Sequence, residues 1–305
     1  KTLGNLEFRG IGGGWTFQDR PRTGSISLNN GALSTNNLIC DFGSLSSESG
    51  NLRSLDLGTS TLNISGGLYI TNTSNLTFLG NDATVNITGG GALSTIGLRF
   101  DAINFTSPQE GLDLNYGPYI ANTMTFNHNC RYFRGNNTIG TLTVNGTFSG
   151  MEGSSTITTA NFNGDSSFPR SNTFGTLNLA GPAGTTYTFG SGTTQTINTA
   201  LNVQPGNCSA LININSSSSG TQATLNIPSG NPTLAYVNLK DMKAQGGATF
   251  TANSVIDLGN NSGWTLSPLA SNNYYWVGGS GNWGSQLNWS TTSGGSPSGC
   301  APTPA

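Results

Sequence analysis

Leu62-Asn63-Ile64 and Val85-Asn86-Ile87 are two copies of the short phrase that decides the fold: an apolar residue, an asparagine and a second apolar residue. Within each phrase apolar and polar residues alternate with a period of two, which is typical of a strand with one buried face. The phrase returns at intervals of roughly a dozen to two dozen residues, with a longer gap after Phe105. The other copies are Ile103-Asn104-Phe105, Leu177-Asn178-Leu179, Leu201-Asn202-Val203, Leu225-Asn226-Ile227 and Val237-Asn238-Leu239.

Short strands repeated in this way predict a solenoid, in which each coil buries its apolar edge against its neighbours. We expect residues 25–266 to form one elongated β-solenoid, a right-handed parallel β-helix, with about twelve coils of roughly 20 residues each. With strands stacked about 4.8 Å apart, the rod should be about 55–60 Å long. A β-sandwich is the alternative fold, because strand signals at this spacing fit it too.

Polar residues complete the predicted coil. Outward-facing Thr, Ser and Asn are expected to hydrogen-bond to the same residue type one coil along, as in stacked polar ladders. Glycine-rich turns such as Gly89-Gly90-Gly91 separate the phrases, and glycine adopts the positive φ that tight corners require.

The composition supports an all-β chain and excludes several functions. Only 8% of the residues are charged, against roughly 25% in ordinary soluble domains. Apolar residues do not recur at helical spacing over several turns, so helices are not expected. The net charge is −2 with the basic residues scattered, whereas a nucleic-acid partner requires clustered Lys and Arg. The chain has no run of 18 apolar residues, so no membrane insertion is expected.

Three zones follow from the local composition. Residues 1–24 hold glycine-rich fragments and are interpreted as an N-terminal segment that leads into the solenoid. Residues 25–266 carry the strand phrases. Residues 267–305 change character: an aromatic junction is followed by a Ser/Gly/Pro tail, which reads as a linker to a following module. No apolar stretch of signal-peptide type opens the chain, so an exported protein would have lost its leader or would be longer than this piece.

The four cysteines, Cys40, Cys130, Cys208 and Cys300, are far apart in the sequence. They are candidates for one or two disulfides between coils in an exported protein, or for small buried core residues. Their pairing cannot be read from the sequence. The only histidine, His128, lies two residues before Cys130, and one such pair is too little for a zinc site, so no metal is expected.

A resemblance rests on the segments at the C-terminal end. Tyr274-Tyr275-Trp276-Val277-Gly278-Gly279-Ser280-Gly281-Asn282-Trp283, continued by Asn288-Trp289-Ser290, is similar to the repeat junctions of large secreted Bacteroidota surface proteins, which are adhesin-like and often type 9 secretion substrates. Residues 15–19, 53–64 and 255–266 also fit such proteins. The resemblance implies an exported, extracellular or cell-surface body without catalytic residues. It implies as partners the neighbouring modules of the same long chain, with glycans or a host surface as further candidates. The C-terminal sorting domain of that export pathway is not seen in this sequence.

Enzymatic activity is not expected, although parallel β-helices include polysaccharide lyases and hydrolases. Such chemistry needs two or three carboxylates, or a carboxylate and an arginine, in one groove. The nearest grouping is Asp101 beside Arg99, followed by Glu110 and Asp113. These acids are better interpreted as solvated loop residues. His128 has no nucleophile motif near it, and no cofactor is predicted.

The aromatic residues of the C-terminal zone are the remaining candidates for a site. Rings on an uncharged β surface can stack on sugar rings, and Tyr274, Trp276, Trp283 and Trp289 lie within one short segment. The structural alternative is that these rings form a small core. The sequence therefore predicts a structural segment of an exported surface fibre or adhesin stalk, with a carbohydrate-binding module as the alternative.

Overall fold

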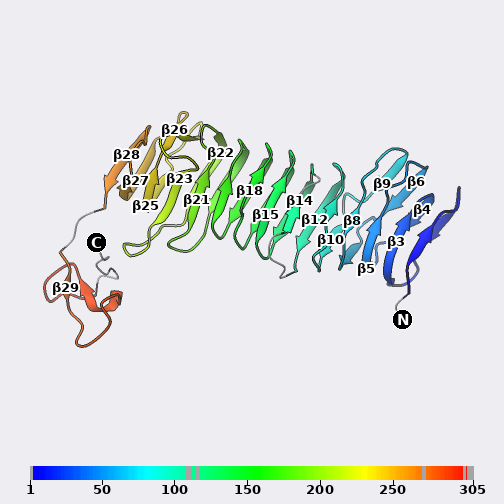
Figure 1. The fold of residues 1–305 in the computed structure, drawn as a ribbon, viewed down its shortest axis with the longest axis horizontal. Coiled ribbons are helices and arrows are strands. Elements are labelled where there is room, and N and C mark those ends of the chain that lie inside the picture. Colours follow the sequence, from blue (N-terminus) through cyan, green and yellow to red (C-terminus); the bar gives the residue numbers. More distant parts are fainter. Residues whose placement is uncertain (1–2, 108–111, 115–116, 270–272, 298–299, 301–305) are drawn as a thin grey trace.

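The computed structural model describes residues 3–107, 112–114, 117–269, 273–297 and 300. Its strands stack in parallel into an elongated rod of about twelve turns, with the N-terminus near one end (Figure 1). The predicted all-β solenoid is therefore confirmed, and the β-sandwich alternative is wrong. Among the described residues the only helical element is the 3-10 turn η1 (Gln286–Asn288).

Each coil contributes strands to two opposite sides of the rod. Most successive strands alternate between one large sheet, which holds 15 strands, and smaller sheets that face it. The large sheet comprises β1 (Leu6–Phe8), β3 (Arg22–Leu28), β5 (Ile39–Ser46), β7 (Thr61–Ile64), β10 (Thr84–Ile87), β12 (Arg99–Phe105), β14 (Ile120–Phe126), β16 (Thr138–Val144), β18 (Thr156–Phe162), β20 (Thr173–Leu179), β22 (Thr194–Val203), β24 (Ala223–Asn226) and β26 (Met242–Gln245), with β8 (Leu68–Tyr69) and β11 (Leu93–Ser94) attached beside β5.

The facing side is built from three sheets. The first holds β2 (Gly14–Thr16), β4 (Gly31–Ser34), β6 (Arg53–Asp56) and β9 (Leu76–Leu79). The second holds β13 (Leu112–Leu114), β15 (Cys130–Arg134) and β17 (Met151–Glu152). The third holds β19 (Ser166–Phe168), β21 (Thr186–Phe189), β23 (Ile212–Ser216), β25 (Thr233–Lys240), β27 (Phe250–Asp257) and β28 (Trp264–Pro268).

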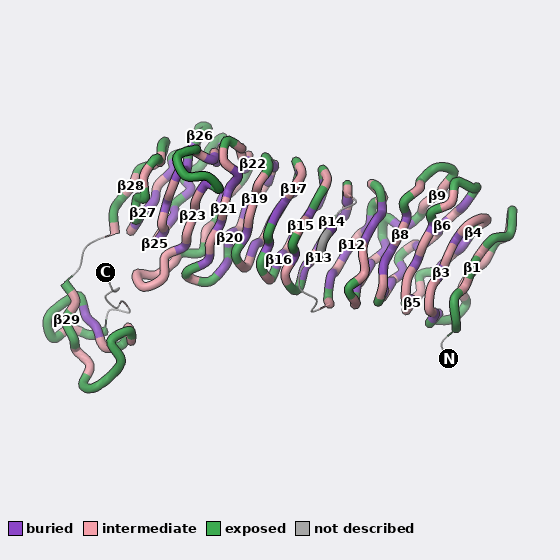
Figure 2. Tube along the Cα trace, viewed as in Figure 1, coloured by how far each residue is buried: buried purple, intermediate pink, exposed green. Residues whose placement is uncertain are grey.

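The core is a continuous apolar column between these two sides. In β10, Val85 and Ile87 are fully buried while Thr84 and Asn86 face outward, as the period of two requires. Figure 2 shows the same alternation along the rod, with buried positions on the strands and exposed ones at the corners. Because every coil is narrow, its apolar side chains pack across the coil, as Phe162 does on Phe168, and against those of the coils before and after it.

The asparagines of the phrases form the predicted ladder on the outer face of the large sheet. The amide nitrogen of Asn86 donates to Oδ1 of Asn63 at 2.9 Å, and that of Asn104 donates to Oδ1 of Asn86 at 3.0 Å. The ladder begins at Asp41, whose Oδ1 accepts from Asn63 at 2.9 Å. It resumes farther along, where Asn202 donates to Oδ1 of Asn178 at 2.8 Å.

The gap after Phe105 is filled by coils that keep the register but change the polar residue. Asn104 aligns with Thr125, Thr125 with Thr143, and Thr143 with Asn161. Threonine alternates with apolar neighbours as asparagine does, so the strand pattern continues through the gap. Five of the seven phrases share this column, whereas Asn226 aligns with Thr196 and Asn238 lies in the facing side.

A charged pair anchors the first rung. Arg20 makes two hydrogen bonds to the Asp41 carboxylate, each of 2.8 Å, and Arg22 approaches the same carboxylate at 3.2 Å. The hydrogen bond from Arg20 is the main reason that the pKa of Asp41 is held below its usual value. A carboxylate is a stronger acceptor than an amide oxygen, so Asp41 is a suitable end group for a column of amide donors.

Aromatic rings cover both ends of the rod. At the N-terminal end β1 pairs with β3 and β2 with β4, so residues 6–16 form the first coil, and Phe8 packs on Trp15 with ring centroids 5.0 Å apart. At the other end Trp264 packs against Phe250 at 5.0 Å and its indole N–H donates to a backbone carbonyl at 3.2 Å. A tryptophan thus shields the last apolar residues at each end.

Glycine is required where strands β3 and β5 of neighbouring coils touch. A Cβ on Gly43 would lie 2.2 Å from the carbonyl oxygen of Gly24 in the preceding coil. No side chain fits at this distance, so glycine sets how closely the two coils approach.

Replacing Asn86 with alanine should lower the free energy of unfolding by about 1–2 kcal/mol, because one donated and one accepted hydrogen bond are lost and two neighbours lose a partner. Chemical denaturation followed by circular dichroism measures the change. Asn198→Ala is the control, because Asn198 is exposed on the same sheet outside the ladder. Equal losses in both variants would contradict a stabilising ladder.

Candidate functional site

The four aromatic residues predicted as a site come together in one small unit at the C-terminal end. Its frame is an antiparallel ribbon of β29 (Tyr275–Trp276) and β30 (Trp289–Ser290). Trp276 stands opposite Trp289 in this ribbon, and the turn η1 leads into the second strand. Figure 1 shows the unit beside the end of the rod that carries β28.

Trp289 is the centre of the cluster. It is only 4% exposed, and its ring centroid lies 4.4 Å from that of Trp283, 5.1 Å from Trp276 and 6.5 Å from Tyr274. All three contacts are edge-to-face, a geometry that aromatic pairs favour. The four aromatic residues therefore make a small core. This is the structural alternative to sugar binding that the sequence analysis described.

Hydrogen bonds explain the spacing of the motif. The indole N–H of Trp289 donates to the Trp283 carbonyl at 2.7 Å, and that of Trp276 donates to the Gly279 carbonyl at 2.9 Å. Asn288 packs so closely that a Cβ on Gly278 would lie 2.3 Å from its side-chain oxygen. The Gly-Gly-Ser-Gly-Asn-Trp run is thus a turn whose glycines make room for Asn288.

Some of the rings remain open to solvent. Trp283 is 61% exposed and Trp276 is 37% exposed, and their rings lie roughly parallel with centroids 6.4 Å apart. Such an exposed indole held by a buried partner can stack on the apolar face of a sugar ring. The cluster therefore offers surfaces for contact and stacking.

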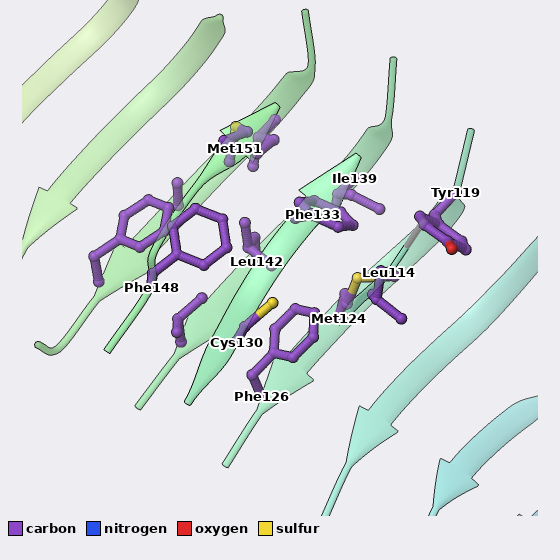
Figure 3. Close-up of a cluster of buried hydrophobic side chains, with 14 of the residues drawn as sticks. Leu114, Tyr119, Met124, Phe126, Cys130, Phe133, Ile139, Leu142, Phe148 and Met151 are labelled. Carbon is purple, nitrogen blue, oxygen red and sulfur yellow. The ribbon is translucent and has the colours of Figure 1, made fainter. Parts of the chain in front are cut away.

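The cysteines have two different environments. Cys208 and Cys300 form a disulfide across 92 residues of sequence, between the corner after β22 and the C-terminal tail. Cys40 and Cys130 are buried thiols outside that disulfide. Figure 3 shows Cys130 in the core beside Phe126, and burial is the main cause that raises the pKa of Cys40 to about 12.

The residues weighed for catalysis are not assembled into a groove by the described part of the chain. Asp101 accepts a hydrogen bond from the Asn122 amide at 2.8 Å on the outer face of β12. His128 is exposed in the turn after β14. Glu110 lies outside the described residues. Among the residues that the structure does describe, no three His, Cys, Asp or Glu side chains are grouped so that they could hold a metal ion.

The structure also reveals a buried arginine that sequence reasoning missed. Arg53 is almost completely buried, and its guanidinium donates to the Ser47 hydroxyl at 2.7 Å and to the carbonyls of Asn72 and Ser74 at 2.8 and 3.0 Å. Burial lowers its pKa. Its partners come from two successive corners, so the cation ties coils together. The alternation in Arg53-Ser54-Leu55 places the arginine on the same face as the buried Leu55, and this was the signal that could have found it.

Trp289→Ala should unfold the ribbon unit, with a loss of about 3–5 kcal/mol for a buried aromatic residue, whereas Trp283→Ala should leave it folded. Near-ultraviolet circular dichroism and the indole N–H signals in proton NMR report on the unit. If both variants keep the wild-type spectrum, Trp289 is not the centre of a core.

The two classes of cysteine should differ in alkylation by iodoacetamide, which attacks the thiolate. We expect no labelling of Cys40 in the folded protein at pH 8, because its pKa of about 12 keeps it a thiol. After mild reduction, Cys208 and Cys300 should be labelled first, and Cys40 and Cys130 only after denaturation. Peptide mass spectrometry identifies the sites, and labelling of Cys40 in the folded rod contradicts its buried placement.

Within the described residues, no helix is long and apolar enough to cross a membrane.

Comparisons with known proteins found no match: no family model, no curated protein and no solved structure matches this chain.

Proposed function

We propose that this chain is a structural segment of an exported cell-surface fibre or adhesin stalk. The observation that carries the proposal is the parallel solenoid of about twelve turns, with a tryptophan at each end and side-chain ladders between several of its coils. In such a body each coil supports only its neighbours, so length can be added without a larger core. This is the property that a spacer needs.

Two further features support a place outside the cell. The Cys208–Cys300 disulfide is of a kind that persists in oxidising compartments and is rare in the cytosol. The low charge fraction of 8% leaves the fold little dependent on surface ion pairs, which salt weakens. The resemblance to repeat junctions of Bacteroidota surface proteins, which are often type 9 secretion substrates, also supports an exported protein.

The neighbouring modules of the same chain are the proposed partners. The ribbon unit follows the rod, and the tail after it is joined back to the corner after β22 by the disulfide, which suits a junction that stays close to the rod. Residues after Cys300 would then lead to the next module.

A carbohydrate-binding role is the second candidate, favoured by the exposed Trp283 ring. The buried Trp289 fixes the orientation of that ring, and fixed aromatic platforms lose little entropy when a sugar stacks on them. On this hypothesis Trp283→Ala removes glycan-array binding, while the fold of the cluster persists.

Antibodies raised against residues 25–266 should label intact cells of the source organism, because a stalk is displayed outside. Immunogold electron microscopy measures this, with a cytosolic protein as control. Labelling that appears only after lysis contradicts the proposal.

A truncated chain ending at residue 270, with Cys208→Ser to avoid a lone thiol, should keep the rod folded and elongated in small-angle X-ray scattering. If this chain unfolds, the ribbon unit is an integral cap of the solenoid and the junction role is wrong.

A further inference from the structure

The outer face of the large sheet carries two columns of outward side chains that repeat from coil to coil. In strands β7 to β22 of this sheet the two outward residues are two positions apart, and the register aligns each with its counterpart one coil along. The second column is the ladder from Asn63 to Asn202, with asparagine in six of eight coils and threonine in the other two. The first column has threonine in six of the same eight coils, at Thr61, Thr84, Thr123, Thr141, Thr159 and Thr176. We call this two-column surface the Thr/Asn face.

The Thr/Asn face is periodic in two directions. Neighbouring coils are about 4.8 Å apart, and residues two positions apart on one strand are separated by about 6.6 Å. Eight coils give the array a length of about 34 Å. Figure 1 shows β10, β12, β14 and β18 running in nearly the same direction along the rod, so the spacing repeats with little twist. The corners differ in length, but the strands on this face stay in register.

The side chains of the Thr/Asn face are held in fixed positions. In the ladder column Asn178 donates to Oδ1 of Asn161 at 2.7 Å, and Asn202 donates to Oδ1 of Asn178 at 2.8 Å. In the other column the residues are mainly threonines, whose branched Cβ restricts rotation about χ1. A face that is already ordered loses little conformational entropy when it binds a rigid surface.

The threonine column presents hydroxyl groups that have no partner in the protein. Within the part of the chain that the structure describes, the hydroxyls of Thr123, Thr141 and Thr159 make no hydrogen bond to another protein group. Each hydroxyl has one donor and two acceptor sites, and these are available to solvent or to a ligand. The hydrogen-bonding capacity of such a group resembles that of a water molecule, and the neighbouring methyl group adds an apolar contact.

The composition of the Thr/Asn face limits what it can bind. Its two columns contain no charged and no aromatic residue from Thr61 to Asn202. Arg99 and Asp101 precede the column position of β12, and both are hydrogen-bonded to Asn122. Charged partners are attracted by clustered charges of opposite sign, and sugar rings are bound by stacking on aromatic rings. The face instead fits a neutral, rigid and periodic surface that offers hydroxyl-like donors and acceptors.

We propose that the Thr/Asn face binds the surface of ice. Ice is a neutral lattice in which every water molecule donates and accepts hydrogen bonds, and its prism faces carry rows of oxygen atoms whose repeats are close to the two spacings of the array. Water molecules held by the threonine hydroxyls take positions of that lattice. Each contact is weak, but the whole array acts at once because its members are fixed on one body. The proposal does not depend on the stalk role, because ice binding and a spacer function are independent properties.

Thr141→Tyr is the main test, because Thr141 lies near the middle of the array and a tyrosine ring there would hold the face away from a flat surface. Thr77→Tyr is the matched control, because Thr77 is exposed on β9 in the facing side of the rod. Both positions point outward, so both variants should keep the circular dichroism spectrum and the unfolding midpoint of the wild type. Thr159→Tyr, one coil along, should behave like Thr141→Tyr, so a folding defect at one position does not decide the result.

Partition of the fluorescently labelled, disulfide-intact chain into slowly growing ice measures binding, and inhibition of ice recrystallisation is a second readout. The wild type and Thr77→Tyr should enter the ice and inhibit recrystallisation. Thr141→Tyr and Thr159→Tyr should lose both properties and stay in the liquid, as serum albumin does.

Three results would overturn the proposal. The first is that the wild type is excluded from ice to the same extent as albumin. The second is that folded Thr141→Tyr and Thr159→Tyr enter ice as the wild type does. The third is that the wild type binds microcrystalline cellulose or chitin but not ice, and loses this binding in Thr141→Tyr, which makes the face a glycan-binding surface. None of these results bears on the surface labelling or scattering that tests the stalk role.

Discussion

The hydrogen-bonded column of side chains along the large sheet is the constraint on which the rest of the rod depends. Four of its asparagines donate to the coil before and accept from the coil after, which favours a single register; they are Asn63, Asn86, Asn161 and Asn178. The rungs from Asn63 to Asn86 and from Asn86 to Asn104 span 23 and 18 residues of sequence. Corners can therefore differ in length while the strands do not slip.

Threonine can replace asparagine in this column because its hydroxyl also accepts. Asn161 donates to the Thr143 hydroxyl at 3.2 Å, so the polar contact continues from a threonine coil to an asparagine coil. The inward residues change at the same time, with Phe126 and Phe162 as larger core residues in this part. Stacked rings such as Phe105 and Phe126, with centroids 4.7 Å apart, show that aromatic residues also follow the coil repeat.

The strands could be predicted from the sequence because the alternation of apolar and polar residues is a local property. Val85 and Ile87 must face one way and Asn86 the other wherever the strand lies. The side of the rod to which a given strand belongs could not be predicted in the same way. Asn238 carries the same phrase as Asn86 but belongs to the facing side. That assignment depends on how many residues each corner uses, and corners carry no periodic signal.

The aromatic cluster was visible in the sequence because its members lie within 16 residues, from Tyr274 to Trp289. The packing of the other rings around Trp289 was not visible in the sequence, because it depends on a turn built from Gly278 and Asn288. The buried side chain of Asp241 could not be predicted for a different reason. Its carboxylate is held by Gly220 and Asn260, which come from corners on either side in the sequence, and only the stacking of coils brings them together.

The disulfide between Cys208 and Cys300 gives the rod a mechanical asymmetry. Tension applied at the two ends of the chain passes from residue 208 to residue 300 through the sulfur–sulfur bond. The coils from β23 to β28 and the ribbon unit then carry no load. The coils before β23 have no such bypass and must resist through their ladders alone. Reduction would put the shielded segment of 92 residues in line with the force, and at about 3.3–3.6 Å per residue its unravelling would lengthen the chain by about 300 Å.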